Sequence, residues 1–160
     1  MLVVSRFQVL PGNRPADPQP FAIRKSVSSA VSIVRLPLAI MDSRKLARLC
    51  REFADNKKAE EIVILDVRKL SSVTDYFVIV SGSSEPHLRA IVDEIADRLR
   101  EEQGIRPRAT DGTVRGAWVV LDYFDVIVHI MRQEIRERYD LESLWGDAPR
   151  VKTRTKPSRR

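Results

Sequence analysis

Two short, almost uninterrupted apolar segments constrain the fold of this chain more than any other feature. Residues 61–67 (EIVILDV) and 73–81 (VTDYFVIVS) are rich in β-branched and aromatic side chains, which favour strands. A strand with one face in water alternates apolar and polar residues, whereas a strand covered on both faces does not need to. Both segments are therefore predicted to be strands of a sheet that is covered on both faces.

Two amphipathic helices are predicted to provide part of that cover. In residues 43–56 the apolar residues recur at intervals of three and four: Leu46, Leu49, Cys50 and Phe53. Asp42 or Ser43 is the expected N-cap of this helix. A second stripe comprises Leu88, Ile91, Val92, Ile95 and Leu99. Its helix is predicted to begin after a cap at Ser84 and to end near Gly104.

Three more strands and a C-terminal helical segment complete the predicted order αββαβββα. The strands are expected at 105–110, 117–123 and 125–131. A turn is predicted at Asp111 and Gly112, and a tight hairpin joins the last two strands. Residues 132–138 are helix-compatible, and Asp140 is a candidate cap for a final turn. The fold class is thus α/β, a single domain with a mixed sheet of about five strands and packed helices.

Length and composition place one domain between two tails. The 160 residues suffice for one core, and no run of about 18 uncharged apolar residues occurs, so a membrane-spanning helix is not expected. Residues 1–40 contain five prolines and no sustained period, which predicts a disordered extension. The extension is interpreted either as inert or as an organellar transit peptide, because it is rich in Arg and poor in acid. The domain is predicted at 41–149, with a basic disordered tail at 150–160.

The net charge of +6 is unevenly distributed. Residues 41–149 carry 17 basic and 21 acidic side chains, a net charge of −4, so the basic character lies in the tails. An acidic domain suits a basic protein partner, and basic tails can contact RNA phosphates in a salt-dependent way. Cys50 is the single cysteine and lies on an apolar helix stripe, which predicts a buried small hydrophobe in a reducing compartment.

Residues that could support catalysis lack the necessary partners. The Ser81–Ser84 loop precedes a helix and could hold a phosphate, as in a nucleotidyltransferase. Mg²⁺ would need clustered carboxylates, but Asp93 and Glu94 diverge on their helix, and Asp122 and Asp125 have no third carboxylate nearby. The serines are interpreted as cap and turn residues, and no cofactor or metal is expected. His129 alternates with apolar residues on a strand and is interpreted as a structural histidine.

Trp118 and Tyr123 are the most distinctive residues of the hairpin. Alternation places Trp118, Val120 and Asp122 on one face of the strand, and Val119, Leu121 and Tyr123 on the other. The two large aromatic residues are either core residues or anchors on an open face that binds a protein partner. The pattern alone does not decide between these interpretations.

Several motifs, taken in order, resemble one known family, the ribosomal silencing factors or Iojap-like proteins. The resemblance runs from about Ser43 to Ala148. It rests on Asp75-Tyr76-Phe77-Val78-Ile79, Ser81-Gly82-Ser83-Ser84, His87, Trp118, Leu121-Asp122-Tyr123, Asp125-Val126, Val128-His129, Tyr139-Asp140-Leu141-Glu142 and Leu144-Trp145-Gly146.

The resemblance implies a non-enzymatic translational repressor. It implies a fold similar to nucleotidyltransferases without their catalytic carboxylates. It also implies binding to a protein of the large ribosomal subunit, at the face that meets the small subunit, so that the subunits cannot join. The implied partner-binding residues are Trp118, Asp122, Tyr123 and Asp125. Most family members have Gly where this chain has Phe124, which implies a local difference in the hairpin or in the surface it meets.

Other functions remain as alternatives. A nucleotidyltransferase-like nucleotide-binding enzyme would require Mg²⁺, and an RNA-binding module would bind ribosomal RNA without protein. An exposed aromatic sheet face could also pair two copies of the chain when no ribosome is present. The expected location is the cytoplasm, or a mitochondrion or plastid if residues 1–40 are a transit peptide.

Overall fold

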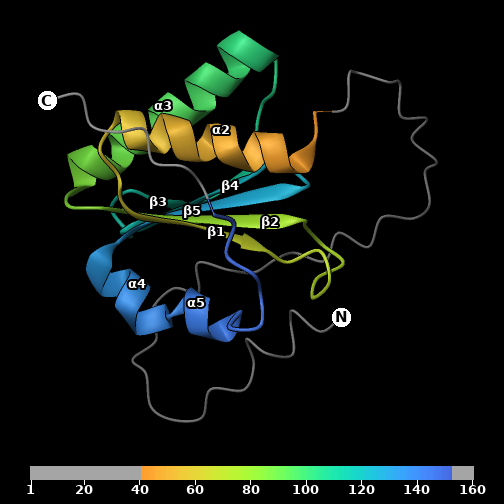
Figure 1. The fold of residues 1–160 in the computed structure, drawn as a ribbon. Helices are drawn as coiled ribbons and strands as arrows, with labels where there is room; N and C mark the ends of the chain where they lie inside the picture. The colour runs from red at the N-terminus through yellow and green to blue at the C-terminus, as the bar shows by residue number, and fades with distance from the viewer. Residues whose placement is uncertain (1–40, 153–160) are drawn as a thin grey trace, which may run out of the picture.

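The computed structural model describes residues 41–152, which form one mixed sheet with helices on both faces (Figure 1). The α/β class and the five-stranded mixed sheet are confirmed. The elements in chain order are α2 (Ser43–Asn56), β1 (Glu60–Asp66), β2 (Tyr76–Gly82), α3 (Glu85–Gln103), β3 (Ala109–Thr113), β4 (Trp118–Asp122), β5 (Val126–Arg132), α4 (Gln133–Tyr139) and α5 (Leu141–Leu144).

The sheet has the order β1-β2-β5-β4-β3. β2 and β5 are parallel and central, and the other neighbouring pairs are antiparallel. Every residue of β2 is buried, as its continuous apolar sequence predicts. β1 differs from the prediction because it is the outer strand, and Glu60 and Glu61 at its start are exposed.

Two separate cores lie on the two faces of the sheet. α2 and α3 pack together on one face, above the sheet in Figure 1, and α4 and α5 lie on the other. The core beneath α2 and α3 includes Cys50, Tyr76, Ile95 and Tyr123. The opposite core includes Phe77, Trp118, Met131, Leu141 and Trp145. Side chains that alternate along one strand therefore enter different cores.

The predicted ends of the two long helices are confirmed. The Asp42 carboxylate caps α2 by accepting a hydrogen bond from Lys45 N–H (3.2 Å). Ser84 Oγ accepts one from His87 N–H (3.3 Å) at the start of α3. Gly104 ends α3 in a left-handed conformation (φ 66°), which glycine adopts without steric cost.

The third strand and its turn lie at positions other than those predicted. β3 occupies Ala109–Thr113 rather than 105–110, and all of its residues are exposed. Asp111 and Gly112 belong to this strand and do not form the turn. The reversal instead lies at 114–117, where Ala117 N–H donates to Val114 O (3.0 Å). A polar outer strand has no apolar alternation from which it could be found.

The start of the predicted C-terminal tail is ordered against the sheet. Arg150 pairs with Leu65, and Val151 N–H donates to Ile64 O (2.8 Å). This contact covers the outer edge of β1. The rest of the predicted tail and the predicted extension at 1–40 lie outside the described residues. Within residues 41–152, no helix is long and apolar enough to cross a membrane.

Candidate functional site

Trp118 is buried within an aromatic cluster on the α4/α5 face. Its side chain is 3% exposed, and its ring centroid lies 5.0 Å from that of Tyr139 and 5.9 Å from that of His129. Phe77 extends the cluster, with its centroid 5.3 Å from His129 and 5.2 Å from Trp145. These five residues are the aromatic cluster. It is held by β2, β4 and β5 from the sheet side and by α4 and the chain around α5 from outside.

Within this cluster, His129 is joined to Trp118 by a hydrogen bond. Trp118 Nε1–H donates to His129 Nδ1 (3.3 Å), so the ring's own proton belongs on Nε2. Burial lowers the pKa of His129 to about 3, because a charged imidazolium loses its hydration there. A neutral, hydrogen-bonded structural histidine is therefore confirmed.

Tyr123 lies on the opposite face from Trp118. It is 5% exposed and belongs to the core beneath α2 and α3, and burial raises the pKa of its hydroxyl. Cys50 is in the same core, where burial raises the pKa of its thiol to about 12. The core interpretation of both aromatic residues is therefore confirmed. The hypothesis of an open sheet face that exposes these aromatic side chains is wrong, because both are buried beneath helices.

Asp122 and Asp125 organise the tip of the β4–β5 hairpin. Asp122 Oδ1 accepts a hydrogen bond from Phe124 N–H (2.8 Å), and Oδ2 lies 3.4 Å from a guanidinium nitrogen of Arg108. The carbonyl of Asp125 accepts hydrogen bonds from Asp75 N–H (3.0 Å) and Tyr76 N–H (3.1 Å). The hairpin tip is thus fastened to the start of β2. Of the four predicted partner-binding residues, these two carboxylates are half-exposed.

The polar side chains of the serine loop and the adjacent His87 form hydrogen bonds within the protein. Ser83 Oγ lies 3.0 Å from His87 Nδ1, and His87 Nε2 lies 2.8 Å from Lys57 O. Ser84 is the helix cap, so the interpretation as cap and turn residues is confirmed for Ser83 and Ser84. It is wrong for Ser81, which is a buried residue of β2. No group of three or more His, Cys, Asp or Glu suited to a metal ion occurs in the described part of the chain.

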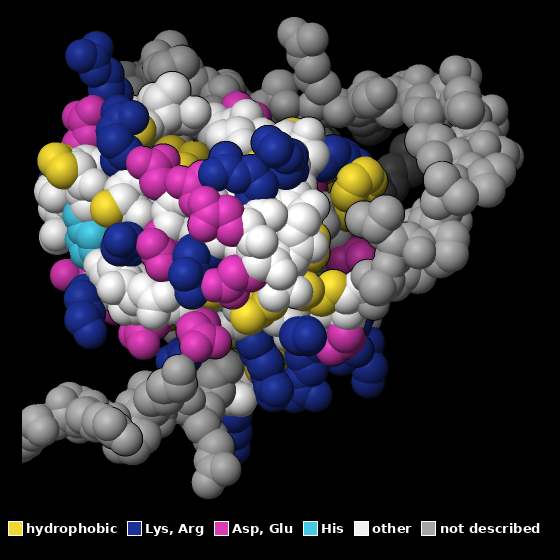
Figure 2. All heavy atoms as spheres, turned by 90° about the horizontal axis from the view of Figure 1, so that it is seen from above, with side chains coloured by type: hydrophobic (Ala, Val, Ile, Leu, Met, Phe, Trp, Pro, Cys, Tyr) yellow, Lys and Arg dark blue, Asp and Glu magenta, His cyan; other side chains and the backbone are white. Residues whose placement is uncertain are grey.

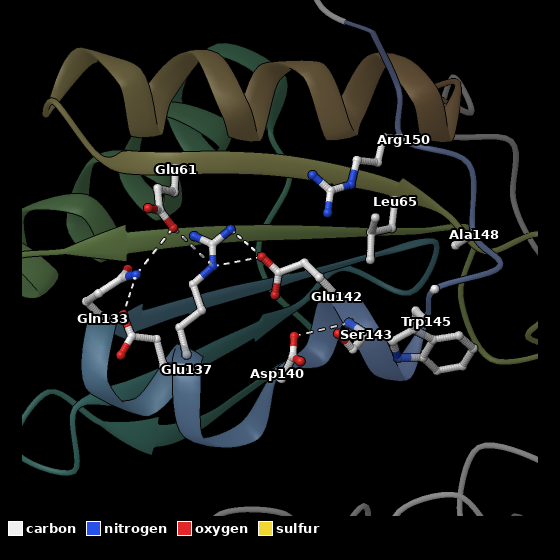
Figure 3. Close-up of a pocket in the computed structure, with 12 residues that line it drawn as sticks. Glu61, Leu65, Gln133, Glu137, Asp140, Glu142, Ser143, Trp145, Ala148 and Arg150 are labelled. Atoms are coloured by element: carbon white, nitrogen blue, oxygen red, sulfur yellow. Dashed lines mark hydrogen bonds and ion pairs between the residues drawn. The ribbon is translucent and has the colours of Figure 1, made fainter.

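A polar cavity of about 480 Å³ lies between β1, α4, α5 and the segment after α5 (Figure 3). Arg136, 5% exposed, lines the cavity. Its Nη1 donates to Ser81 Oγ (2.9 Å) and its Nε to Glu142 Oε1 (2.8 Å). The other carboxylate oxygen of Glu142 is buried and has no hydrogen-bond partner among residues 41–152.

Sequence reasoning missed this buried ion pair. Arg136 lies in a segment that is polar and helix-compatible, where an arginine is expected in water. Arg136 and Glu142 lie in two separate helices, at a spacing that matches no helical repeat, so the sequence carries no signal of their pairing. The pair joins α4 to β2 and to α5, so it positions the helices that cover the aromatic cluster.

The chain is similar to proteins of one family throughout the described region. Residues 40–160 match a family model described as "Ribosomal silencing factor during starvation". A ribosomal silencing factor of Halalkalibacterium halodurans is 39% identical over 111 residues, covering 69% of this chain and 94% of that protein.

A more distant relative and a solved structure extend the comparison. The mouse protein named "Mitochondrial assembly of ribosomal large subunit protein 1" is 32% identical over 94 residues, covering 56% of this chain and 40% of the mouse protein. A crystal structure of a Chromobacterium violaceum protein has a TM-score of 0.63 and 28% identity, covering 74% of this chain and 98% of that one.

Proposed function

Because the chain belongs to the ribosomal silencing factor family, we propose that it represses translation by binding the large ribosomal subunit and sterically blocking its joining with the small subunit. The partner is a ribosomal protein at the intersubunit face. The observation that carries the proposal is the family match over residues 40–160, which includes the whole described domain. The name of the mouse relative supports the choice of the large subunit.

Such a function needs no chemistry. A bound factor that buries roughly 1,000–2,000 Å² on one subunit excludes the other by occupying its volume. The internal contacts of the serine loop and the pairing of Asp122 with Arg108 support a binding role over a nucleotidyltransferase-like activity. We therefore propose a repressor that acts without catalysis, in the cytoplasm, with an organelle as the alternative.

The partner-binding surface is proposed at the hairpin tip and the adjoining strand β4. Asp122 and Asp125 contribute negative charge toward a basic ribosomal protein, in keeping with the net charge of −4 for residues 41–149. Trp118 and Tyr123 contribute by packing β4 and the hairpin from opposite faces, so that the surface is fixed before binding. Their role is to position the surface.

The face of the molecule that is covered by α2 and α3 is not suited to binding RNA. Figure 2 shows Lys and Arg interspersed with Asp and Glu over this face. Many of these charges are paired, as in Lys57–Glu94 (3.2 Å) and Arg100–Asp97 (3.0 Å). A surface with both signs interspersed has no field that attracts phosphate. Any RNA contact is proposed for the basic residues of the C-terminal tail.

Sedimentation with separated ribosomal subunits tests the proposal. The full chain should migrate with large subunits and not with small ones. Asp125→Arg should weaken that binding about tenfold, because it places a positive charge against a basic partner while keeping the backbone contacts of residue 125. Asp111→Arg, on the exposed outer strand, is the matched control and should bind normally. Migration of the wild type with small subunits, or with neither, would refute the proposal.

A further inference from the structure

Among the described residues, the three exposed large hydrophobic side chains all lie at one end of the sheet. Leu70 (37% exposed) and Val73 (53%) are in the connection from β1 to β2, and Phe124 (54%) is at the tip of the β4–β5 hairpin. β2 and β5 are parallel neighbours, so the segments that precede them reach the sheet at the same end. We call these three residues the apolar end of the sheet.

The two loops that carry the apolar end are joined by backbone hydrogen bonds. The carbonyl of Asp125 accepts hydrogen bonds from Asp75 and Tyr76, which tie the hairpin tip to the β1–β2 connection. In that connection, Leu70 N–H donates to Val67 O (2.9 Å). Ordering these loops on binding therefore costs little entropy, which favours recognition by this end of the molecule.

Phe124 has a backbone conformation that is unfavourable for its side chain. Its φ is +68°, in the left-handed region that a bulky L-residue rarely occupies. Asp125 N–H donates to Tyr123 O (3.0 Å), which closes a three-residue turn around Phe124 of the rare, strained type. Gly or Asn would adopt this turn more readily. Phe124 is therefore both strained in its backbone and largely exposed to solvent. Neither the strain nor the exposure contributes to the stability of the fold.

The ring of Phe124 is nevertheless held in place. The guanidinium carbon of Arg108 lies 4.6 Å from the ring centroid, and Arg108 also pairs with Asp122. Asp122 in turn accepts the hydrogen bond from Phe124 N–H. Backbone and ring are thus fixed by the same two residues, and the rest of the ring remains exposed. A large aromatic group presented in one orientation has the form of a binding anchor.

The charges around the apolar end indicate a protein partner. The charges in and next to these loops show no excess of basic side chains: Arg68, Lys69 and Arg108 stand against Asp66, Asp75, Asp122 and Asp125. Two of the pairs are direct ion pairs, Arg68–Asp66 and Arg108–Asp122. An apolar surface without an excess of basic charge gives little attraction to phosphates and suits an apolar recess on a protein.

We propose that Phe124, flanked by Val73 and Leu70, inserts into an apolar recess of a ribosomal protein on the large subunit. This inference rests on the proposed function and names the group that makes the central contact. The strain at residue 124 is retained because the exposed ring serves binding and not the stability of the free protein.

Two substitutions that fit the turn separate binding from folding. Phe124→Gly and Phe124→Asn adopt positive φ, so relief of strain offsets the lost Arg108 contact, and the thermal midpoint should stay within about 3 °C of wild type. Both should weaken binding to isolated large subunits about tenfold or more, since an interface anchor is lost. Phe124→Tyr keeps the ring and should bind normally, and so should Arg89→Ala on the exposed surface of α3. Val73→Ser should give a smaller loss.

The outcomes distinguish this inference from the proposed function. If wild type binds large subunits and the Gly and Asn variants bind equally well, the role of Phe124 is refuted and the proposed function stands. If wild type does not bind large subunits, both fail. Binding of wild type to purified ribosomal RNA of the large subunit, lost in Phe124→Gly, would also overturn the inference, because the ring would then contact RNA rather than protein.

Discussion

The neutral state of buried His129 predicts that the domain loses stability in mild acid. Its pKa is lowered by burial from the ordinary 6.5 to about 3. In the unfolded chain the imidazole takes up a proton near pH 6.5, whereas in the folded chain it stays neutral down to about pH 3. Stability is therefore complete above pH 6.5 and is lost as the pH falls toward 3.

The size of the effect follows from the shift. Each pH unit below 6.5 removes about 1.4 kcal/mol, so His129 costs the fold about 2 kcal/mol at pH 5. The acidic groups with lowered pKa values, Asp66, Glu94 and Glu134, have ordinary values of 4.5 or below and change protonation mainly below pH 5. These three carboxyl groups therefore contribute little between pH 7 and pH 5, and variants of His129 separate its contribution in this interval from that of other groups.

Urea denaturation of the full chain at pH 7, 6 and 5 measures this loss. His129→Asn places an oxygen near the position of Nδ1 and keeps an acceptor for Trp118, whereas His129→Phe keeps the ring shape and leaves Trp118 Nε1 without that acceptor. The two variants should differ in stability at pH 7, yet both should lose about 2 kcal/mol less than wild type between pH 7 and 5. An equal loss in all three proteins would refute the argument.

Three further predictions concern the buried pair, the thiol and the tail. Arg136→Met should destabilise the fold by about 3–5 kcal/mol in urea denaturation, because Glu142 is left as an unpaired buried charge, and Arg136→Met with Glu142→Leu should recover much of this. Cys50 should react with a thiol reagent only after unfolding, since burial raises its pKa to about 12. A reaction rate at pH 7.5 equal to that of a free thiol would contradict its burial. Removal of residues 153–160 should make large-subunit binding less sensitive to salt, and an unchanged salt dependence would exclude tail contacts with RNA.

Much of the fold could be predicted because local chemistry and tertiary packing agree. Apolar spacing and the caps at Asp42, Ser84 and Gly104 located α2 and α3, whose observed ends match. Continuous apolar sequence identified the central strand β2. By contrast, β3 (ATDGT) is an outer strand without apolar residues apart from Ala109, and only its pairing with β4 defines it.

The candidate site could be predicted only in part. Alternation correctly assigned Trp118 and Tyr123 to opposite faces, but it could not show that helices cover both faces at these positions. Arg136 is hydrogen-bonded to Ser81, 55 residues away in the sequence, and to Glu142, 6 residues away. Neither separation belongs to a helical or strand repeat, so no sequence pattern predicts these contacts. The left-handed conformation of Phe124 was also not expected, because phenylalanine disfavours it.

A light-scattering measurement of subunit joining tests directly whether the protein acts by steric exclusion. Large subunits are first incubated with increasing amounts of the protein and are then mixed with small subunits. If the protein acts by steric exclusion, joining falls in proportion to the protein bound and is abolished near one copy per large subunit. Full joining at saturating occupancy would contradict it, because a bound factor that leaves the intersubunit face free cannot silence the ribosome by steric exclusion.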